Sequence, residues 1–237
     1  GIHRGKLISA TDIDDFKALV KGMTKRNETS EVDTPPEMNC QLMKHQKIGL
    51  HRLLELERSR SFGGLLSDEM GLGKTIQMIA LMVANRQTLT GEGDVYSKEK
   101  YPILIVAPVS LLHNWKFEIQ SKIKPEYQFS ITTFHENNKP ATFAELQKFD
   151  VVLTSYTTLD DEYKKHLPGN YDKGTNSFRD STGEMRKFPA LPTINFMKSL
   201  KRSDEYESPF YREDSMFYRI ILDESHEIKN LETGKFK

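Results

Sequence analysis

The chain has 237 residues, and its 34 Lys and Arg are balanced by 34 Asp and Glu, so the formal net charge is zero. A neutral chain has no bulk attraction to nucleic acid, so such a partner would have to be recognised by motifs or a local patch. The single cysteine excludes an internal disulfide and fits a reducing compartment. No run of 18 apolar residues occurs, which predicts that the chain has no membrane partner.

The first 40 residues predict an N-terminal extension and a linker. Residues 11–23, TDIDDFKALVKGM, have the apolar spacing of a short helix. Residues 24–39, TKRNETSEVDTPPEMN, are polar and contain a Pro-Pro pair, which is typical of a linker. The extension either braces the domain that follows or contacts a partner, and its pattern does not choose between them.

From residue 41 onward, helical and strand patterns alternate. Residues 42–59 have a helical rhythm, and further helical patterns lie at residues 74–87, 111–122 and 141–149. Short β-type runs at residues 63–67, 102–108, 128–135, 150–156 and 218–225 predict strands. Several of these runs are apolar throughout, as expected when helices cover both faces of a parallel sheet. The pattern predicts a doubly wound three-layer α/β sandwich with a mainly parallel sheet.

Residues from about 160 to 216 interrupt this regularity. The segment is rich in polar and turn-forming residues and has no sustained apolar period. We expect an insertion or a mobile loop outside the core.

The stretch GLLSDEMGLGKT, at residues 64–75, joins an apolar strand to a helix through a loop that contains glycines. Such a junction directs backbone N–H groups and the positive end of the helix toward one point, which suits a phosphate. Gly71 and Gly73 leave room for the anion, Lys74 supplies a positive charge, and the Thr75 hydroxyl is a ligand for Mg²⁺. The alternative is an ordinary turn with an exposed lysine. Asp68 stands where the general phosphate-loop template has its first glycine.

An acidic pair, Asp223 and Glu224, ends the last apolar strand in the motif YRIILDESHEIKN. In a doubly wound sheet the carboxyl ends of the strands share one edge, which also carries the phosphate loop. Asp223 is therefore expected to hold Mg²⁺, directly or through water, and Glu224 to orient or deprotonate a water. The alternative is a pair of solvated acids. His226 either is an ordinary residue at a helix start, or senses the terminal phosphate or links the site to a neighbouring element.

Five segments together resemble the Swi/Snf-type DNA translocases of helicase superfamily two. These segments are LMKHQKIGL, SDEMGLGKTIQMIAL, ILIVAPVSLLHNWKFEI, DVVLTSYTTL and IILDESHEIKN. The family has Asp at the position of Asp68. The resemblance implies a RecA-like P-loop lobe that binds ATP and Mg²⁺. It implies an adenine contact from Gln46 and a nucleotide cradle formed by Asp68, Met70, Gly71, Leu72, Gly73, Lys74 and Thr75.

The resemblance covers most of residues 42–159 and 218–230. It implies that residues 41–237 are a first RecA-like lobe, and that the second lobe with its arginine fingers is absent. Such a fragment is expected to bind ATP weakly and to hydrolyse almost none. His45 and the long insertion are more similar to the RING-finger-containing repair and SUMO-linked branch than to the core remodellers.

The resemblance also implies a nuclear ATPase that moves double-stranded DNA against chromatin or DNA-bound proteins without separating the strands. The expected DNA contacts go to the backbone, from Ser110, Asn114 and Lys116 on one helix and from Thr154 and Ser155 at a strand end. The alternatives are a solvated Lys116 and, for the hydroxyl residues, a polar helix cap, which explains them equally well. Trp115 shares a helical face with Leu112 and Ile119, which favours a core position over base stacking.

Two other functions remain open. One is a catalytically inert lobe that serves as a partner-binding platform. The other is a different P-loop ATPase, which would need glycine at position 68 and would not explain the HQKIG and LLHNW segments.

Overall fold

The computed structural model describes residues 30–59, 64–67, 74–165, 167, 170–180, 182–188, 207–212 and 214–223. The helices are α2 (Lys44–Ser59), α3 (Lys74–Ala84), α4 (Val95–Lys98), α5 (Val109–Lys122), α6 (Phe143–Leu146) and α7 (Tyr156–Lys164), with a 3-10 turn, η1 (Pro125–Tyr127). The strands are β1 (Gly64–Ser67), β2 (Ile103–Ala107), β3 (Ile131–Phe134), β4 (Val151–Ser155), β5 (Ser177–Arg179), β6 (Met185–Lys187) and β7 (Arg219–Asp223). None of these helices is long and apolar enough to cross a bilayer.

The central sheet of the described residues has five strands in the order β1-β7-β2-β4-β3, and every neighbouring pair is parallel. All five strands were predicted from the sequence pattern, and the predicted α/β fold with a parallel sheet is confirmed. Strand β7 comes last in the chain yet lies between β1 and β2. This insertion places β1, which precedes residues 68–73 in the sequence, next to the strand that ends at Asp223.

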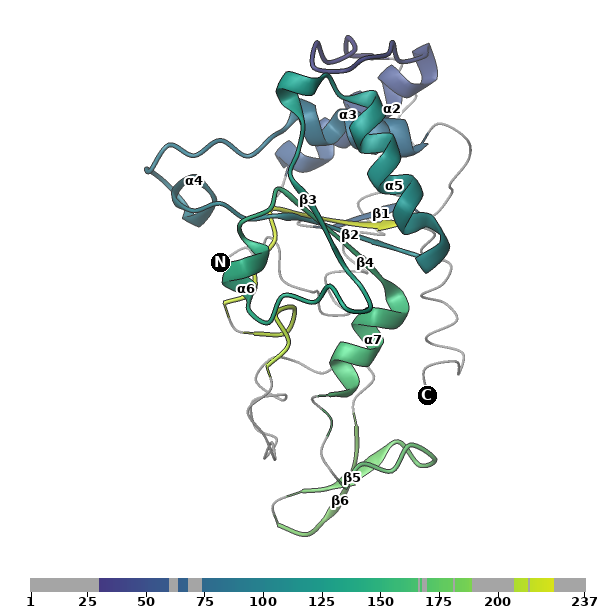
Figure 1. The fold of residues 1–237 in the computed structure, drawn as a ribbon, viewed down its shortest axis with the longest axis vertical. Coiled ribbons are helices and arrows are strands. Elements are labelled where there is room, and N and C mark those ends of the chain that lie inside the picture. The colour runs from purple at the N-terminus through teal and green to yellow at the C-terminus, as the bar shows by residue number, and fades with distance from the viewer. Residues whose placement is uncertain are drawn as a thin grey trace.

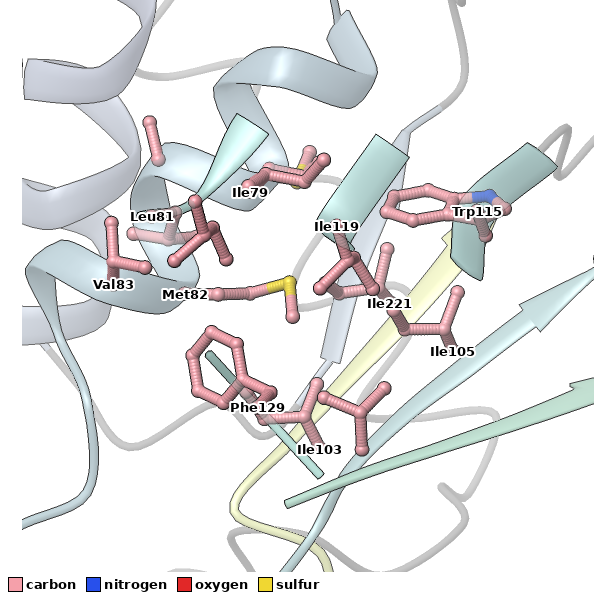
Figure 2. Packing of buried hydrophobic residues seen from close by; sticks show 14 of the residues in the cluster. Ile79, Leu81, Met82, Val83, Ile103, Ile105, Trp115, Ile119, Phe129 and Ile221 are labelled. Carbon is pink, nitrogen blue, oxygen red and sulfur yellow. The ribbon is translucent and has the colours of Figure 1, made fainter. Parts of the chain in front are cut away.

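Helices cover both faces of the sheet. Helices α2, α3 and α5 lie on one side and α6 and α7 on the other (Figure 1). Because side chains alternate along a strand, Ile103 and Ile105 of β2 point to the first face, while Leu104 and Val106 point to the second. Figure 2 shows the first of these two cores, where Met82 and Ile119 pack against Ile103, Ile105 and Ile221. Burial on both faces explains why β2 is a continuous apolar run and why β4 is mostly apolar.

Two connections at the carboxyl edge of the sheet, from β2 to α5 and from β4 to α7, are short. One residue, Pro108, separates β2 from α5, and α7 begins directly after β4. The predicted helix at residues 141–149 is reduced to α6, which Thr142 caps by accepting a hydrogen bond from Glu145 N. Short connections fix where each helix starts, so the helix starts lie close to the sheet edge.

Residues 30–40 pack against the lobe, although their polar composition suggested a linker. The side chain of Met38 is only 4% exposed and belongs to the first core. The backbone is held at both ends of this contact, because Asn39 N donates to Lys122 O and Lys124 N donates to Glu37 O. The described part of the extension therefore braces the end of α5. The helix predicted at residues 11–23 lies outside the described residues.

The polar segment at residues 160–216 contains more structure than expected. Strands β5 and β6 form an antiparallel hairpin, whose aromatic residues Phe178 and Phe188 cluster with Tyr163. Phe210 is 2% exposed and packs edge-to-face on Phe134, which places it in the second core. The low average hydropathy of the segment did not indicate that these few aromatic residues are buried. Their packing anchors the described parts of the segment. The proposed domain boundaries themselves stay a prediction.

Candidate functional site

The carboxyl ends of β1 and β7 lie side by side. Ser67, the last residue of β1, is in register with Asp223, the last residue of β7. Helix α3 begins seven residues after Ser67 with Lys74 and Thr75, both half-buried. The acidic strand end therefore lies beside the strand that leads into the GKT sequence, as the motifs required. The predicted residues Asp68, Met70, Gly71, Leu72, Gly73, Glu224 and His226 lie outside the described residues.

Asp223 is buried and tightly held. Its side chain is 3% exposed, and its Oδ2 accepts a hydrogen bond of 2.6 Å from Nε1 of Trp115. Its backbone oxygen accepts a second hydrogen bond, of 2.7 Å, from the hydroxyl of Tyr156. A buried carboxylate needs such partners, since an uncompensated charge away from water is costly. The alternative of a solvated acid does not describe Asp223.

Trp115 and Tyr156 are site residues that sequence reasoning did not assign. Trp115 was predicted to lie in the core, and its exposure of 1% confirms this. In Figure 2 its ring lies at the edge of the core, near the end of β7. The predicted core position of Trp115 did imply a polar partner, because a buried indole N–H usually finds a hydrogen-bond acceptor. The structure shows that this acceptor is Asp223. Nothing in the sequence pattern singled out the hydroxyl of Tyr156.

Gln46 lies beside the first turns of α3. Its Oε1 accepts a hydrogen bond of 2.9 Å from Met43 N, which caps the start of α2. Its backbone oxygen accepts from Nε2 of Gln77, one turn after Lys74, at 3.3 Å. Gly49 permits this close packing, because a Cβ there would come within 1.7 Å of Gln77 Nε2. The predicted adenine-binding residue is thus next to the GKT helix, and a side-chain amide has both donor and acceptor groups for adenine.

The start of α5 is open to solvent at the same edge. Ser110, Asn114 and Lys116 are all exposed, and the N-cap residue Pro108 makes no side-chain capping hydrogen bond. The first N–H groups of a helix favour negative charge, so this helix start is suited to a phosphate. These three predicted residues therefore occupy accessible positions.

The hydroxyls of Thr154 and Ser155 form hydrogen bonds within the protein. Both are fully buried, and the hydroxyl of Thr154 donates to the backbone oxygen of Phe134 at 3.0 Å. Ser155 is the N-cap of α7, and its Oγ accepts a hydrogen bond from Thr158 N at 3.1 Å. The structure thus favours the helix-cap alternative for Ser155 and a structural role for Thr154. Thr157, in the first turn of α7, is exposed.

The residues at this edge fit a nucleotide with its magnesium ion. Lys74 and Thr75 open an eleven-residue helix, which offers a positive charge, a hydroxyl and a helix start. Asp223 adds a carboxylate on the neighbouring strand. Mg²⁺ prefers oxygen ligands that it shares with substrate phosphates, and this donor set provides them.

Sequence comparison identifies the family of this lobe. Residues 45–237 match the SNF2-related domain. The chain belongs to the SNF2-related family. The matched region starts at the residue before Gln46 and includes every strand of the central sheet. The resemblance of the five motifs is thereby confirmed.

Named relatives agree with this assignment. The chain is 44% identical, over 99% of its length, to the ATP-dependent helicase ULS1 of Saccharomyces cerevisiae. It is 32% identical, over 86% of its length, to the ATP-dependent helicase rhp16 of Schizosaccharomyces pombe. It is 35% identical, over 53% of its length, to the chromatin-remodeling ATPase INO80 of Neurospora crassa. The chain spans 14%, 19% and 6% of these relatives, respectively.

Proposed function

We propose that this chain is the ATP-binding lobe of a double-stranded-DNA translocase that acts on chromatin or DNA-bound proteins in the nucleus. The observation that carries the proposal is the pairing of Ser67 with Asp223. The strand that precedes the GKT sequence and the strand that ends at Asp223 therefore have their carboxyl ends side by side at one edge of the sheet. Membership of a family whose named members include ATP-dependent helicases and chromatin-remodeling ATPases supports the biological role. The repair and SUMO-linked branch stays a prediction.

In this proposal each residue has a separate task. Lys74 binds the outer phosphates, and Gln46 recognises adenine from the start of α2. Thr75 and Asp223 hold Mg²⁺, which neutralises charge on the phosphates when it is bound. Glu224 orients the attacking water and accepts its proton. Arginines of a second lobe would complete the site, and without them turnover falls by about 10³–10⁵-fold.

The DNA contact is proposed at the exposed starts of two helices. Ser110 and Thr157 are exposed in the first turns of α5 and α7, and Asn114 and Lys116 are exposed further along α5. Such residues contact phosphate and not base edges, so the binding would be nonspecific in sequence and sensitive to salt. Thr154 and Ser155 are left out because their hydroxyls are buried.

ATP hydrolysis with and without duplex DNA tests the function. The protein is a longer version of the chain that includes a second RecA-like lobe, beside its Lys74→Ala and Glu224→Gln variants. We expect turnover that DNA stimulates and that both substitutions abolish, whereas Glu224→Gln retains ATP binding. Turnover that is indifferent to DNA would favour a different ATPase. If neither turnover nor Lys74-dependent ATP binding is found, the partner-binding platform is the better description.

Salt dependence tests the DNA contact separately. Replacing Lys116 by Ala removes one phosphate contact, so affinity should fall for every duplex sequence alike. The slope of log affinity against log salt should become shallower by about one unit. Replacing the exposed Lys98 of α4, which lies outside the proposed contact, is the matched control and should leave the slope unchanged.

A further inference from the structure

Helices α5 and α7, which carry the residues of the proposed DNA contact, each donate a hydrogen bond to Asp223. Trp115 belongs to α5, and its indole N–H donates to the Asp223 carboxylate at 2.6 Å. Tyr156 is the first residue of α7, and its hydroxyl donates to the Asp223 backbone oxygen at 2.7 Å. The proposed magnesium ligand is therefore held from two sides, at its carboxylate and at its backbone.

Both contacts are buried and rigidly placed. Trp115 is 1% exposed and Tyr156 is 7% exposed, so water does not compete for either hydrogen bond. Trp115 lies between Leu112 and Ile119 on the buried face of α5, which fixes its ring against the sheet. Interiors are close-packed, so a small displacement of α5 is transmitted to the residues that pack against it.

The same two helices present the exposed residues of the proposed DNA contact. Ser110 and Asn114 precede Trp115 on α5 by less than two turns, and Asn114 is its direct neighbour. Thr157 follows Tyr156 directly in the first turn of α7. A phosphate held at either helix start therefore acts on a rigid element whose buried side is hydrogen-bonded to Asp223.

From this arrangement we infer that Trp115 and Tyr156 are positioning residues that couple DNA binding to magnesium and ATP binding through Asp223. The inference rests on the proposed function and adds to it a route of regulation. DNA at the starts of α5 and α7 stabilises the position in which Asp223 holds the metal. The coupling is reciprocal, so Mg²⁺ with ATP raises the affinity for DNA by the same factor.

Trp115 is the chain's single tryptophan, which gives a direct readout without any substitution. Indole emission of the 237-residue chain is followed while ATP is added first with a chelator and then with Mg²⁺. Because the indole N–H is bound to the carboxylate that takes the metal, the emission should change at the Mg²⁺ step. In Asp223→Asn the Mg²⁺ step should be silent. Unchanged emission in the unsubstituted chain while Mg²⁺ with ATP binds would overturn the inference.

The two hydrogen bonds are then removed one at a time. Trp115→Phe keeps a buried aromatic ring but loses the donor, and Tyr156→Phe loses only a hydroxyl. Binding of a labelled ATP analogue is measured against Mg²⁺ concentration, with and without duplex DNA. Loss of a partner that orients a metal ligand typically weakens metal affinity 10–100-fold, so the Mg²⁺ midpoint in Trp115→Phe should rise about tenfold. In the unsubstituted chain, DNA should lower the midpoint about fivefold or more, and in both variants this shift should be lost.

Controls separate coupling from folding and from the function itself. Tyr127→Phe removes a hydroxyl from an exposed tyrosine of η1 and should leave both quantities unchanged. Each variant must keep its ability to bind DNA without nucleotide, because a coupling residue does not touch DNA. If ATP binds in a Lys74-dependent way but both variants keep the native Mg²⁺ midpoint and DNA shift, the coupling is wrong and the proposed function stands. If no Lys74-dependent binding of ATP occurs, both fail together.

Discussion

Arg219 and Glu57 form a bidentate ion pair inside the protein. Arg219 Nε lies 2.5 Å from Glu57 Oε1, and Arg219 Nη2 lies 2.9 Å from Glu57 Oε2. Asn85 completes the group, since its backbone oxygen accepts from Arg219 at 2.9 Å and its amide donates to Glu57 at 2.6 Å. The group joins the end of α2, the residue after α3 and the first residue of β7. It lies at the opposite end of β7 from Asp223.

Breaking this pair should be strongly destabilising. Arg219→Met leaves the Glu57 carboxylate buried without its cation, and such changes cost about 3–5 kcal/mol. Chemical denaturation at neutral pH measures the loss. Arg186→Met is the matched control, because Arg186 is 61% exposed in its ion pair with Asp180 and should matter by less than about 1 kcal/mol. The double variant Glu57→Met with Arg219→Met should be more stable than Arg219→Met alone. An equally unstable double variant would show that the charge itself is not the cause.

Two substitutions of Gln46 should distinguish its role in helix capping from its proposed role in nucleotide recognition. Gln46→Ala removes the acceptor for Met43 N, so stability should fall by about 1 kcal/mol and ATP binding should weaken. Gln46→Glu keeps that acceptor and places a negative charge at a helix start, so stability should be retained. A carboxylate cannot donate to adenine, so ATP binding should be as weak as in Gln46→Ala. Native ATP affinity in Gln46→Glu, measured by calorimetry, would rule out an adenine contact through the amide donor.

Phe210 should be as important for stability as a central core residue, although it lies in the polar segment. It packs on Phe134 with ring centroids 4.7 Å apart and stacks on Phe217 at 6.1 Å. Phe210→Ala should therefore cost about 3–5 kcal/mol in thermal or chemical denaturation. Phe117 is 58% exposed on α5, and Phe117→Ala should change stability by about 0.5 kcal/mol or less. Equal losses in the two variants would contradict the burial assigned to Phe210.

Asp150 should make stability depend on pH in the acid range. Burial acts to raise the pKa of Asp150, but hydrogen bonds from Ser130 and the charge of Lys100 outweigh it and hold the pKa below its ordinary value of 3.8. The contacts are short, at 2.7 Å from Ser130 N and 3.0 Å from Lys100 Nζ. A carboxyl whose folded pKa is depressed stabilises the protein above its unfolded pKa, and this stability is lost as pH falls through the folded pKa.

Asp150→Asn is the test of this dependence. The variant should be less stable than the unsubstituted chain at pH values above about 4, and the difference should shrink as the pH falls further. Denaturant midpoints measured across the acid range give the difference directly. Asp214→Asn, at an exposed acid, is the control and should follow the unsubstituted chain more closely. A constant difference at every pH would mean that the substitution acts through packing and not through charge.

Local pattern was sufficient to predict the strands and the main helices. The apolar runs around Ile105 and Leu153 are buried on both faces, so their composition carried the strand signal. The spacing of Leu112, Trp115 and Ile119 likewise carried the helical face of α5. The polar average composition of residues 30–40 and of the polar segment did not predict that they pack against the domain. Met38 and Phe210 each anchor one of these polar stretches to a core. One buried side chain is enough for that, and a mean over the segment does not record it.

The sequence by itself determined which groups are available for the chemistry: the GKT helix start, the acidic strand end and the Gln46 amide. Only the tertiary structure decided that β7 lies between β1 and β2, and so that Ser67 lies beside Asp223. It also decided that Trp115 and Tyr156 hold Asp223, and that the hydroxyls of Thr154 and Ser155 are used internally. The physical reason is range. Periodicity and capping act over a few neighbouring residues, whereas Trp115 and Asp223 are 108 positions apart, and only the packing of the whole sheet brings them together.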